Sequence, residues 1–146
     1  MNPITVTDLH VRYGRGDGVH AVRGVSLAVA EGEVYALLGH NGAGKTSTVE
    51  VLEGHRSATS GHVRVLGHDP ADGERELRDR IGIVLQSSSV ERALTVGEAL
   101  TFYGSAYRRP RDPAELVELV DLTGLLDRRI GTLSGGQARR LDLALG

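Results

Sequence analysis

The chain has 146 residues, a formal net charge of −2 and 25% charged side chains, a composition typical of a globular protein with one sizeable hydrophobic core. The near-neutral charge gives no reason to expect nonspecific nucleic-acid binding, and the absence of cysteine excludes disulfides and thiolate metal sites. No stretch approaches the roughly 18 apolar residues that span a bilayer, and the N-terminal segment lacks the basic start and apolar run of a signal peptide.

The first third of the sequence has the alternating pattern of strands. Apolar and polar residues alternate over 4–6 and again, in shifted phase, over 9–13, which predicts a strand with a bulge near Asp8. Alternation over 25–29 predicts a second strand of an antiparallel sheet with one face in water. The tripeptide EGE at 31–33 then predicts a tight turn.

Two later segments are apolar without alternation. VYALL (34–38) and IGIVLQ (81–86) are short continuous apolar runs, so we expect two strands that are buried on both faces. Between them, TSTVEVLEG (46–54) predicts a short helix that ends at a glycine, and SGHVRVLGHD (60–69) predicts a strand between two turns.

From about residue 89 the pattern becomes helical. Thr95 with Glu98 forms a capping box at the start of one helix. Asp112 can cap the next helix, with Pro113 at its first position. We therefore expect a nucleotide-binding core with an antiparallel β subdomain over 1–88 and a helical subdomain over 89–146.

One motif points to phosphate chemistry. GHNGAGKT (39–46) matches G-x-x-x-x-G-K-[ST] and lies between a predicted strand and a predicted helix. Its glycines let the backbone wrap around phosphate oxygens, so that amide groups and the helix N-terminus point at the anion. Lys45 is expected to reach the β- and γ-phosphates and the Thr46 hydroxyl to bind Mg²⁺. The alternative is a glycine-rich turn with a chance lysine.

A second glycine pair stands where another helix should begin. Ser134 and Gln137 form the S-x-x-Q capping box, which places Gly135 and Gly136 in the first turn. Glycine costs a helix roughly 1 kcal/mol relative to alanine. What the pair offers is bare backbone at the positive end of a helix dipole, and this indicates a second anion site rather than a flexible loop.

Together these motifs resemble the ATP-binding subunits of ABC (ATP-binding cassette) transporters. GHNGAGKT is similar to that family's Walker A motif, and LSGGQ (133–137) is similar to its signature motif. Gln86 matches the family's Q-loop glutamine, and Tyr13 stands where the family has an aromatic residue that stacks on adenine. LTVGEALTFYGSAY (94–107) is most similar to exporter subunits that pair with separate membrane proteins. The resemblance covers essentially all 146 residues.

The resemblance implies ATP and Mg²⁺ as ligands. Lys45 and Gln86 would act in hydrolysis, and Thr46 and Gln86 would bind the metal. Ser134 and Gly136 would bind the γ-phosphate held by the opposite subunit's Walker A loop, in a head-to-tail dimer. The full nucleotide-binding set that the resemblance implies is Tyr13, Gly39, Asn41, Gly42, Ala43, Gly44, Lys45, Thr46, Ser47, Ser134, Gly135, Gly136 and Gln137.

The resemblance also implies the fold and the partners. The expected fold is α/β, a P-loop NTPase of the ABC ATPase type, with an N-terminal antiparallel β subdomain and a helical signature subdomain. Its partners would be membrane-spanning transporter subunits and a second ATPase subunit, on the cytoplasmic face of the membrane, with no nucleic acid. Tyr13 as the end of a strand and Gln86 as a polar strand end remain the alternatives for those two residues.

Part of the family's catalytic apparatus has no counterpart. Family members hydrolyse ATP with a Walker B aspartate and the glutamate after it, which end an apolar strand beyond the signature helix. In this sequence the run at 81–86 ends in glutamine, and Asp142 lies in the last predicted helix. We therefore expect an N-terminal portion of an ATPase, without the C-terminal core strands and without hydrolysis. A soluble ABC ATPase without a transport role, and a non-hydrolysing ATP-dependent interaction module, remain open.

Overall fold

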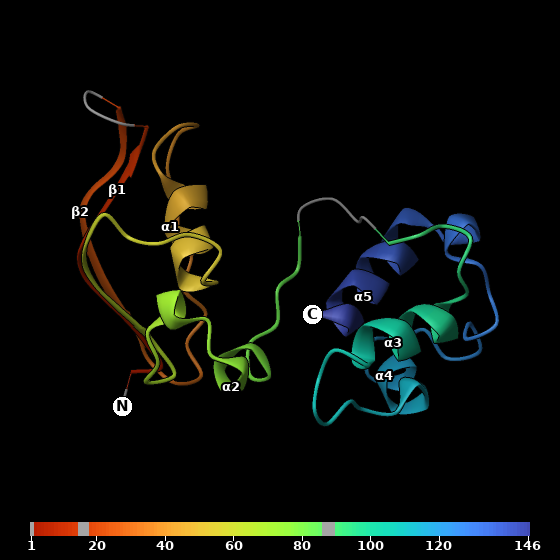
Figure 1. Ribbon diagram of the computed structural model, residues 1–146. Helices are drawn as coiled ribbons and strands as arrows, with labels where there is room; N and C mark the ends of the chain where they lie inside the picture. Colours follow the sequence, from red (N-terminus) through yellow and green to blue (C-terminus); the bar gives the residue numbers. More distant parts are fainter. Residues whose placement is uncertain (1, 15–17, 86–89) are drawn as a thin grey trace. The chain divides into compact units, whose positions relative to one another are not determined.

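The computed structural model describes residues 2–14, 18–85 and 90–146, and it divides into two compact units, residues 1–80 and 81–146. Figure 1 shows both units. The domain border expected at 88/89 stays a prediction. Among the described residues, no helix is both long enough and apolar enough to span a bilayer.

The first unit is built on a three-stranded antiparallel sheet in the order β2-β1-β3. Its strands are β1 (Ile4–Tyr13), β2 (Val19–Val29) and β3 (Ser60–Val65). The pairing of β1 with β2 skips a step at Asp8, which has a positive φ of 50° and donates its amide N–H to the Ser26 hydroxyl at 2.9 Å. The predicted bulge and antiparallel sheet are therefore confirmed.

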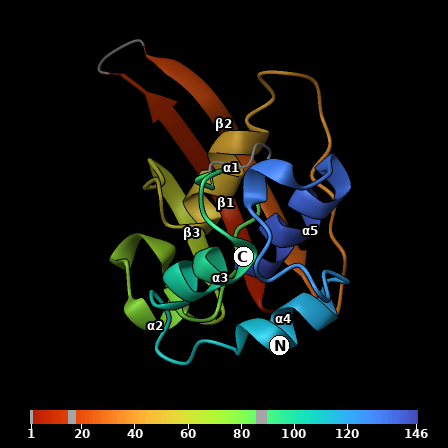
Figure 2. The ribbon, with the colours of Figure 1, turned by 90° about the vertical axis from the view of Figure 1, so that its right-hand side faces the viewer.

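Helix α1 (Lys45–Leu52) lies against this sheet, as Figures 1 and 2 show, and contacts all three strands. Its buried Val51 belongs to the hydrophobic core of the unit together with buried residues of the three strands. These residues are Val6, Leu9, Val11, Val22, Val63 and Val65. The helix ends at the C-cap Glu53, followed by Gly54 with φ of 75°, where the sequence predicts its end. Two short elements, η1 (Pro70–Asp72) and α2 (Arg75–Arg78), complete the unit.

The two predicted buried strands are not formed. Residues 34–38 and 81–85 have no strand structure, and the Val34 and Leu38 side chains are 96% and 86% exposed. The physical reason is that a strand requires hydrogen bonds from a neighbouring strand, and no described segment pairs with either run. Gln86, which ends the second run, lies outside the described residues.

The second unit is helical. Its helices are α3 (Val96–Gly104), α4 (Pro113–Leu119) and α5 (Gly135–Leu145), with a short turn η2 (Ile130–Thr132). Both predicted capping boxes are present, at Thr95 with Glu98 and at Ser134 with Gln137, and Asp112 caps α4. The buried core consists of Val96, Ala99, Leu100, Val117, Val120, Leu122, Ile130 and Leu141.

Candidate functional site

The glycine-rich loop at 39–46 leads into α1, and two of its glycines have backbone conformations that other residues rarely adopt. Gly42 and Gly44 have φ of 84° and 85°. Gly44 is the N-cap of α1, and no side chain caps the helix. A Cβ on Gly44 would collide with the backbone carbonyl of Ala21 and would approach a Val22 methyl group to 3.0 Å. Glycine at position 44 is therefore required by the fold of this unit.

Lys45 provides the positive charge of the loop. Its Nζ donates hydrogen bonds to the carbonyl oxygens of Gly39 at 2.7 Å and of His40 at 2.8 Å, so the ammonium group is held across the loop. It is the only lysine in a chain with 16 arginines. A compact ammonium can exchange these carbonyl oxygens for phosphate oxygens without leaving the loop.

The first turn of α1 offers amide groups and hydroxyls. The first amide groups of a helix have no intrahelical acceptor, and the first turn of α1 carries no acidic side chain to compete with an anion. Thr46 is exposed, whereas Ser47 and Thr48 are buried. The Thr48 hydroxyl donates to the Gly44 carbonyl at 3.0 Å, and the Ser47 hydroxyl is 2.8 Å from the Tyr13 hydroxyl. Thr46 therefore carries the hydroxyl that is open to a metal ion.

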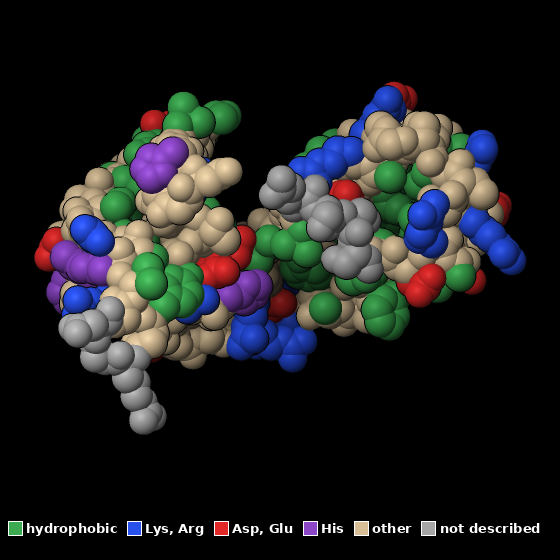
Figure 3. Space-filling model, turned by 90° about the horizontal axis from the view of Figure 1, so that it is seen from above, with side chains coloured by type: hydrophobic (Ala, Val, Ile, Leu, Met, Phe, Trp, Pro, Cys, Tyr) green, Lys and Arg blue, Asp and Glu red, His purple; other side chains and the backbone are tan. Residues whose placement is uncertain are grey.

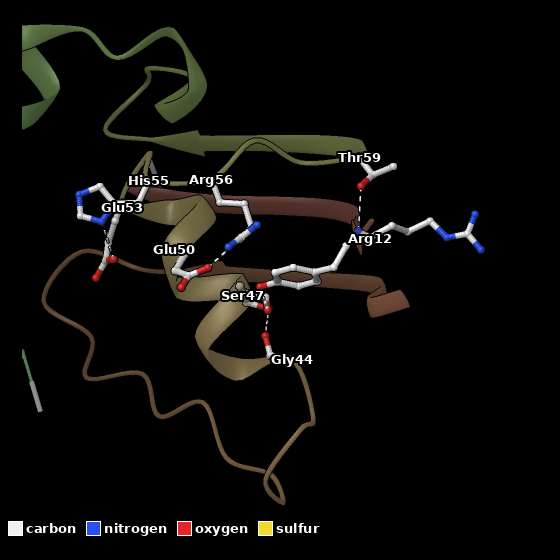
Figure 4. Close-up of polar contacts among 10 residues, drawn as sticks. Arg12, Gly44, Ser47, Glu50, Glu53, His55, Arg56 and Thr59 are labelled. Carbon is white, nitrogen blue, oxygen red and sulfur yellow. Dashed lines mark hydrogen bonds and ion pairs between the residues drawn. The ribbon is translucent and has the colours of Figure 1, made fainter. Parts of the chain in front are cut away.

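Tyr13 is fixed beside this helix by contacts that the sequence motifs do not predict. Its hydroxyl is hydrogen-bonded with Ser47, and the Arg56 guanidinium carbon lies 4.2 Å from the centroid of its ring. Arg56 Nε in turn donates to Glu50 Oε2 at 2.6 Å. The hydrogen bond that Arg56 donates to Glu50 raises the pKa of Arg56 above its ordinary value, against a smaller effect of desolvation. Figure 4 shows Glu50 and Ser47 on α1, with Arg56 just beyond the end of that helix.

The second candidate site is the start of α5. The Ser134 hydroxyl accepts from the Gln137 amide at 3.3 Å, and Gln137 Oε1 accepts from the Ser134 amide at 2.9 Å. Gly135 and Gly136 are exposed, and a Cβ on either would meet no atom within 4 Å. Neither has a positive φ. Within the described residues nothing requires glycine at these positions, and their backbone is exposed.

The structure brings Tyr13, Gly44, Lys45 and Ser47 together in the first unit and places 134–137 in the second. The residues fit a bound polyphosphate because α1 presents an uncapped N-terminus, an ammonium group and an open hydroxyl at one loop. No group of three or more histidine, aspartate or glutamate side chains in the described ranges can hold a metal ion.

Comparisons with known proteins find similar proteins over most of the chain. The family model described as ABC transporter matches residues 22–146. The chain is 44% identical over 138 residues to the daunorubicin resistance ATP-binding protein DrrA2 of Streptomyces coeruleorubidus, covering 91% of this chain and 42% of that protein. It is 37% identical over 147 residues to the Nod factor export ATP-binding protein I of Burkholderia orbicola, covering 97% of this chain and 47% of that protein.

Solved structures show the same fold. The structure of cbiO1 from Clostridium perfringens, part of the ABC transporter complex cbiONQ, superposes with a TM-score of 0.82 at 26% sequence identity. The match covers 99% of this chain and 60% of that one. The chain thus spans less than half the length of the two curated relatives and about three fifths of the solved structure.

Proposed function

This chain belongs to the ABC transporter family of ATP-binding proteins, and from that premise we propose that residues 39–46 and Tyr13 form an ATP site that serves a membrane transporter. The observation that carries the proposal is the loop at the start of α1, where Gly44 is sterically required and Lys45 lies across the loop carbonyls. The phosphate chain would take the place of those carbonyl oxygens as the acceptor for Lys45. Mg²⁺ would neutralise charge on the phosphates, with Thr46 as one of its ligands.

Each residue of the site has a role that follows from its position. The amides of Gly44 and Lys45 bind phosphate oxygens at the positive end of α1, where no acidic side chain repels them. Tyr13 presents its ring to the adenine base. Gln86, which lies outside the described residues, would contact the metal or the attacking water in a form of the protein that hydrolyses ATP.

The start of α5 serves a second nucleotide in the same proposal. Ser134 and Gly136 bind the γ-phosphate held by another subunit, because the chain already has one phosphate loop and the Gly136 backbone is open. Two ATPase subunits then form a head-to-tail dimer with ATP between them. That dimer would couple ATP binding to transport by membrane-spanning partners at the cytoplasmic face. We propose export as the direction of transport from the names of DrrA2 and the Nod factor export protein, although another relative of 37% identity is named for spermidine/putrescine import.

Calorimetry with Lys45→Ala tests the nucleotide site directly. Removing a charge-assisted contact worth about 1.5–3 kcal/mol should weaken ATP binding roughly 10- to 150-fold. Lys45→Arg is the matched control, since it retains the charge but replaces the compact ammonium with a planar guanidinium. Its ATP affinity should lie between those of wild type and Lys45→Ala. Equal ATP affinity in wild type and Lys45→Ala would reject the site.

ATP hydrolysis requires acidic groups in addition to the phosphate loop. Within residues 1–146 no pair of acids ends an apolar strand, so we propose that these residues bind ATP without hydrolysing it by themselves. Phosphate release should be at background for this chain. It should become measurable and Lys45-dependent when the chain is extended through an apolar strand and acid pair of a relative. Lys45-dependent turnover by residues 1–146 would show that an acid such as Asp142 performs that role.

Ser134→Arg in the same extended chain tests the second site. It should block turnover while leaving nucleotide binding nearly intact, because the residue would act on the other subunit's ATP. Equal loss of binding and turnover would show that the 134–137 segment acts within its own chain or only supports the fold.

A further inference from the structure

Arg56 contacts the ring of Tyr13 and pairs with Glu50, and neither Arg56 nor Glu50 belongs to a motif of the chain. The Arg56 guanidinium carbon lies 4.2 Å from the centroid of the Tyr13 ring, within the range of an attractive cation–π contact. At that distance the guanidinium occupies one of the two faces of the ring. A base can then stack only on the other face.

The guanidinium is itself held in place. Arg56 Nε donates to Glu50 Oε2 at 2.6 Å, and both side chains are about one third exposed. Glu50 lies on α1, and the backbone at Arg56 is tied to the same helix because its amide donates to the Glu50 carbonyl at 3.1 Å. Glu50 therefore fixes Arg56 through both its side chain and its backbone.

The tyrosine is also tied to the phosphate loop. Its hydroxyl is 2.8 Å from the buried Ser47 hydroxyl, two residues after Lys45 on α1. In Figure 4, Arg56 and Gly44 lie on opposite sides of Ser47. Ser47 on α1 thus fixes the Tyr13 hydroxyl. Arg56, which Glu50 of the same helix holds in place, covers one face of the Tyr13 ring.

From this geometry we propose that Arg56, oriented by Glu50, is a positioning residue that covers one face of the Tyr13 ring and so sets the plane on which the adenine base stacks. This inference rests on the proposed ATP site, to which it adds a residue that helps to recognise the adenine base. Arg56 does not touch the phosphates in this proposal. It contributes to binding only through Tyr13.

The test compares two ligands that share phosphates and differ in the base, ATP and inorganic tripolyphosphate, measured by calorimetry on the 146-residue chain. Arg56→Leu should weaken ATP binding about two- to fivefold, the worth of a partly exposed cation–π contact, and leave tripolyphosphate binding unchanged. A loss of the same size for both ligands would assign Arg56 to the phosphates or to the fold, and would overturn the proposal. Unchanged ATP affinity would overturn it as well.

A double-mutant comparison isolates the route through the tyrosine. In a Tyr13→Ala background, Arg56→Leu should change ATP affinity no further, because its effect passes through the missing ring. A further loss of the same size in that background would show that Arg56 acts independently of Tyr13.

Exchanging the two charged residues distinguishes the effect of the ring contact on ATP affinity from the effect of the ion pair. Glu50→Arg combined with Arg56→Glu restores an ion pair between the two positions but puts a carboxylate over the ring face, which the π-electrons repel. ATP affinity should therefore stay low in the swap while its thermal unfolding returns toward that of wild type. Recovery of ATP affinity would mean that only the ion pair matters.

The outcomes also separate this inference from the ATP site itself. If wild type binds neither ATP nor tripolyphosphate, the proposed function fails and the role of Arg56 fails with it. If wild type binds both and Arg56→Leu matches it for both, the ATP site stands and only the positioning role is rejected.

Discussion

Two helices in this chain begin at glycines, and the two starts differ in what requires the glycine. At α1, Gly44 has φ of 85° and a Cβ would collide with the Ala21 carbonyl, so the unit's own packing forbids any other residue. At α5, Gly136 is exposed, has no positive φ and faces open space. The first glycine is required by the fold of its unit, whereas nothing in the described part of the second unit requires a glycine at position 136.

The caps of the two helices differ in the same way. The start of α1 has no side-chain cap, so its amides are left to a ligand. The start of α5 has a complete capping box, in which the side chains of Ser134 and Gln137 bind each other's backbone amides. The two glycines that follow Ser134 have no side chain to cover their backbone. In the function proposed above, the start of α1 would bind this chain's own nucleotide, and the start of α5 would face the nucleotide of a second subunit.

The largest expected effect separates the two glycines. Gly44→Ala should destabilise the first unit by roughly 2–4 kcal/mol, because a left-handed conformation costs an alanine about 1–2 kcal/mol and the clash with Ala21 adds to it. Gly42→Ala is the matched control, since φ there is also positive but a Cβ meets no atom within 4 Å. Chemical denaturation followed by circular dichroism measures both. An equal loss of unfolding free energy in the two variants would show that the clash with Ala21 does not contribute to the destabilisation.

A smaller effect is expected from the cap of α5. Ser134→Ala should cost the second unit about 1 kcal/mol, since the Gln137 amide loses its acceptor. Thr95→Ala removes the same kind of cap from α3 in that unit and should cost a similar amount. Amide hydrogen exchange, read separately for each unit, checks the size. No change after Ser134→Ala would show that the box adds nothing to helix stability.

Gly136→Ala should act in the opposite direction to Gly44→Ala. Alanine is the better helix former by up to about 1 kcal/mol, and nothing in the described part of the unit opposes a methyl group there. The second unit should therefore become slightly more stable, by the same hydrogen-exchange measurement. A destabilisation comparable to that of Gly44→Ala would mean that Gly136, too, is required by the fold.

The smallest expected effect distinguishes the two units by pH. All six histidines lie in the first unit, where Figure 3 shows several of them at the surface. Burial, with Arg12 and His10 nearby, lowers the pKa of His20 below its ordinary 6.5, so the unfolded chain takes up the proton first and stability falls as pH drops below 6.5. In the second unit a backbone hydrogen bond from Thr95 lowers the pKa of Glu98 below 4.5, so its contribution is lost only at more acid pH.

The measurement compares wild type with His20→Asn between pH 7 and pH 5. Wild type should lose more stability in the first unit than the variant over that range, and the second unit should respond to neither the variant nor the pH change. Parallel curves for wild type and His20→Asn would show that His20 does not contribute to this pH dependence.

Local structure was largely determined by the sequence. The bulge at Asp8, the end of α1 at Gly54 and the capping boxes of α3 and α5 follow from side chains and backbone preferences within a few residues of each other. The family followed as well, because the glycine loop and LSGGQ are contiguous motifs. Their chemistry depends on spacing along the chain rather than on distant contacts.

Only the tertiary structure decided what depends on residues far apart in sequence. Apolar runs at 34–38 and 81–85 predict strands, yet strand formation depends on a neighbour, and none pairs with them in the described chain. The contact of Arg56 with Tyr13 joins residues 43 positions apart, and no pattern of residue types signals it. The steric need for Gly44 likewise comes from Ala21 on β2, because only folding brings that carbonyl against the loop.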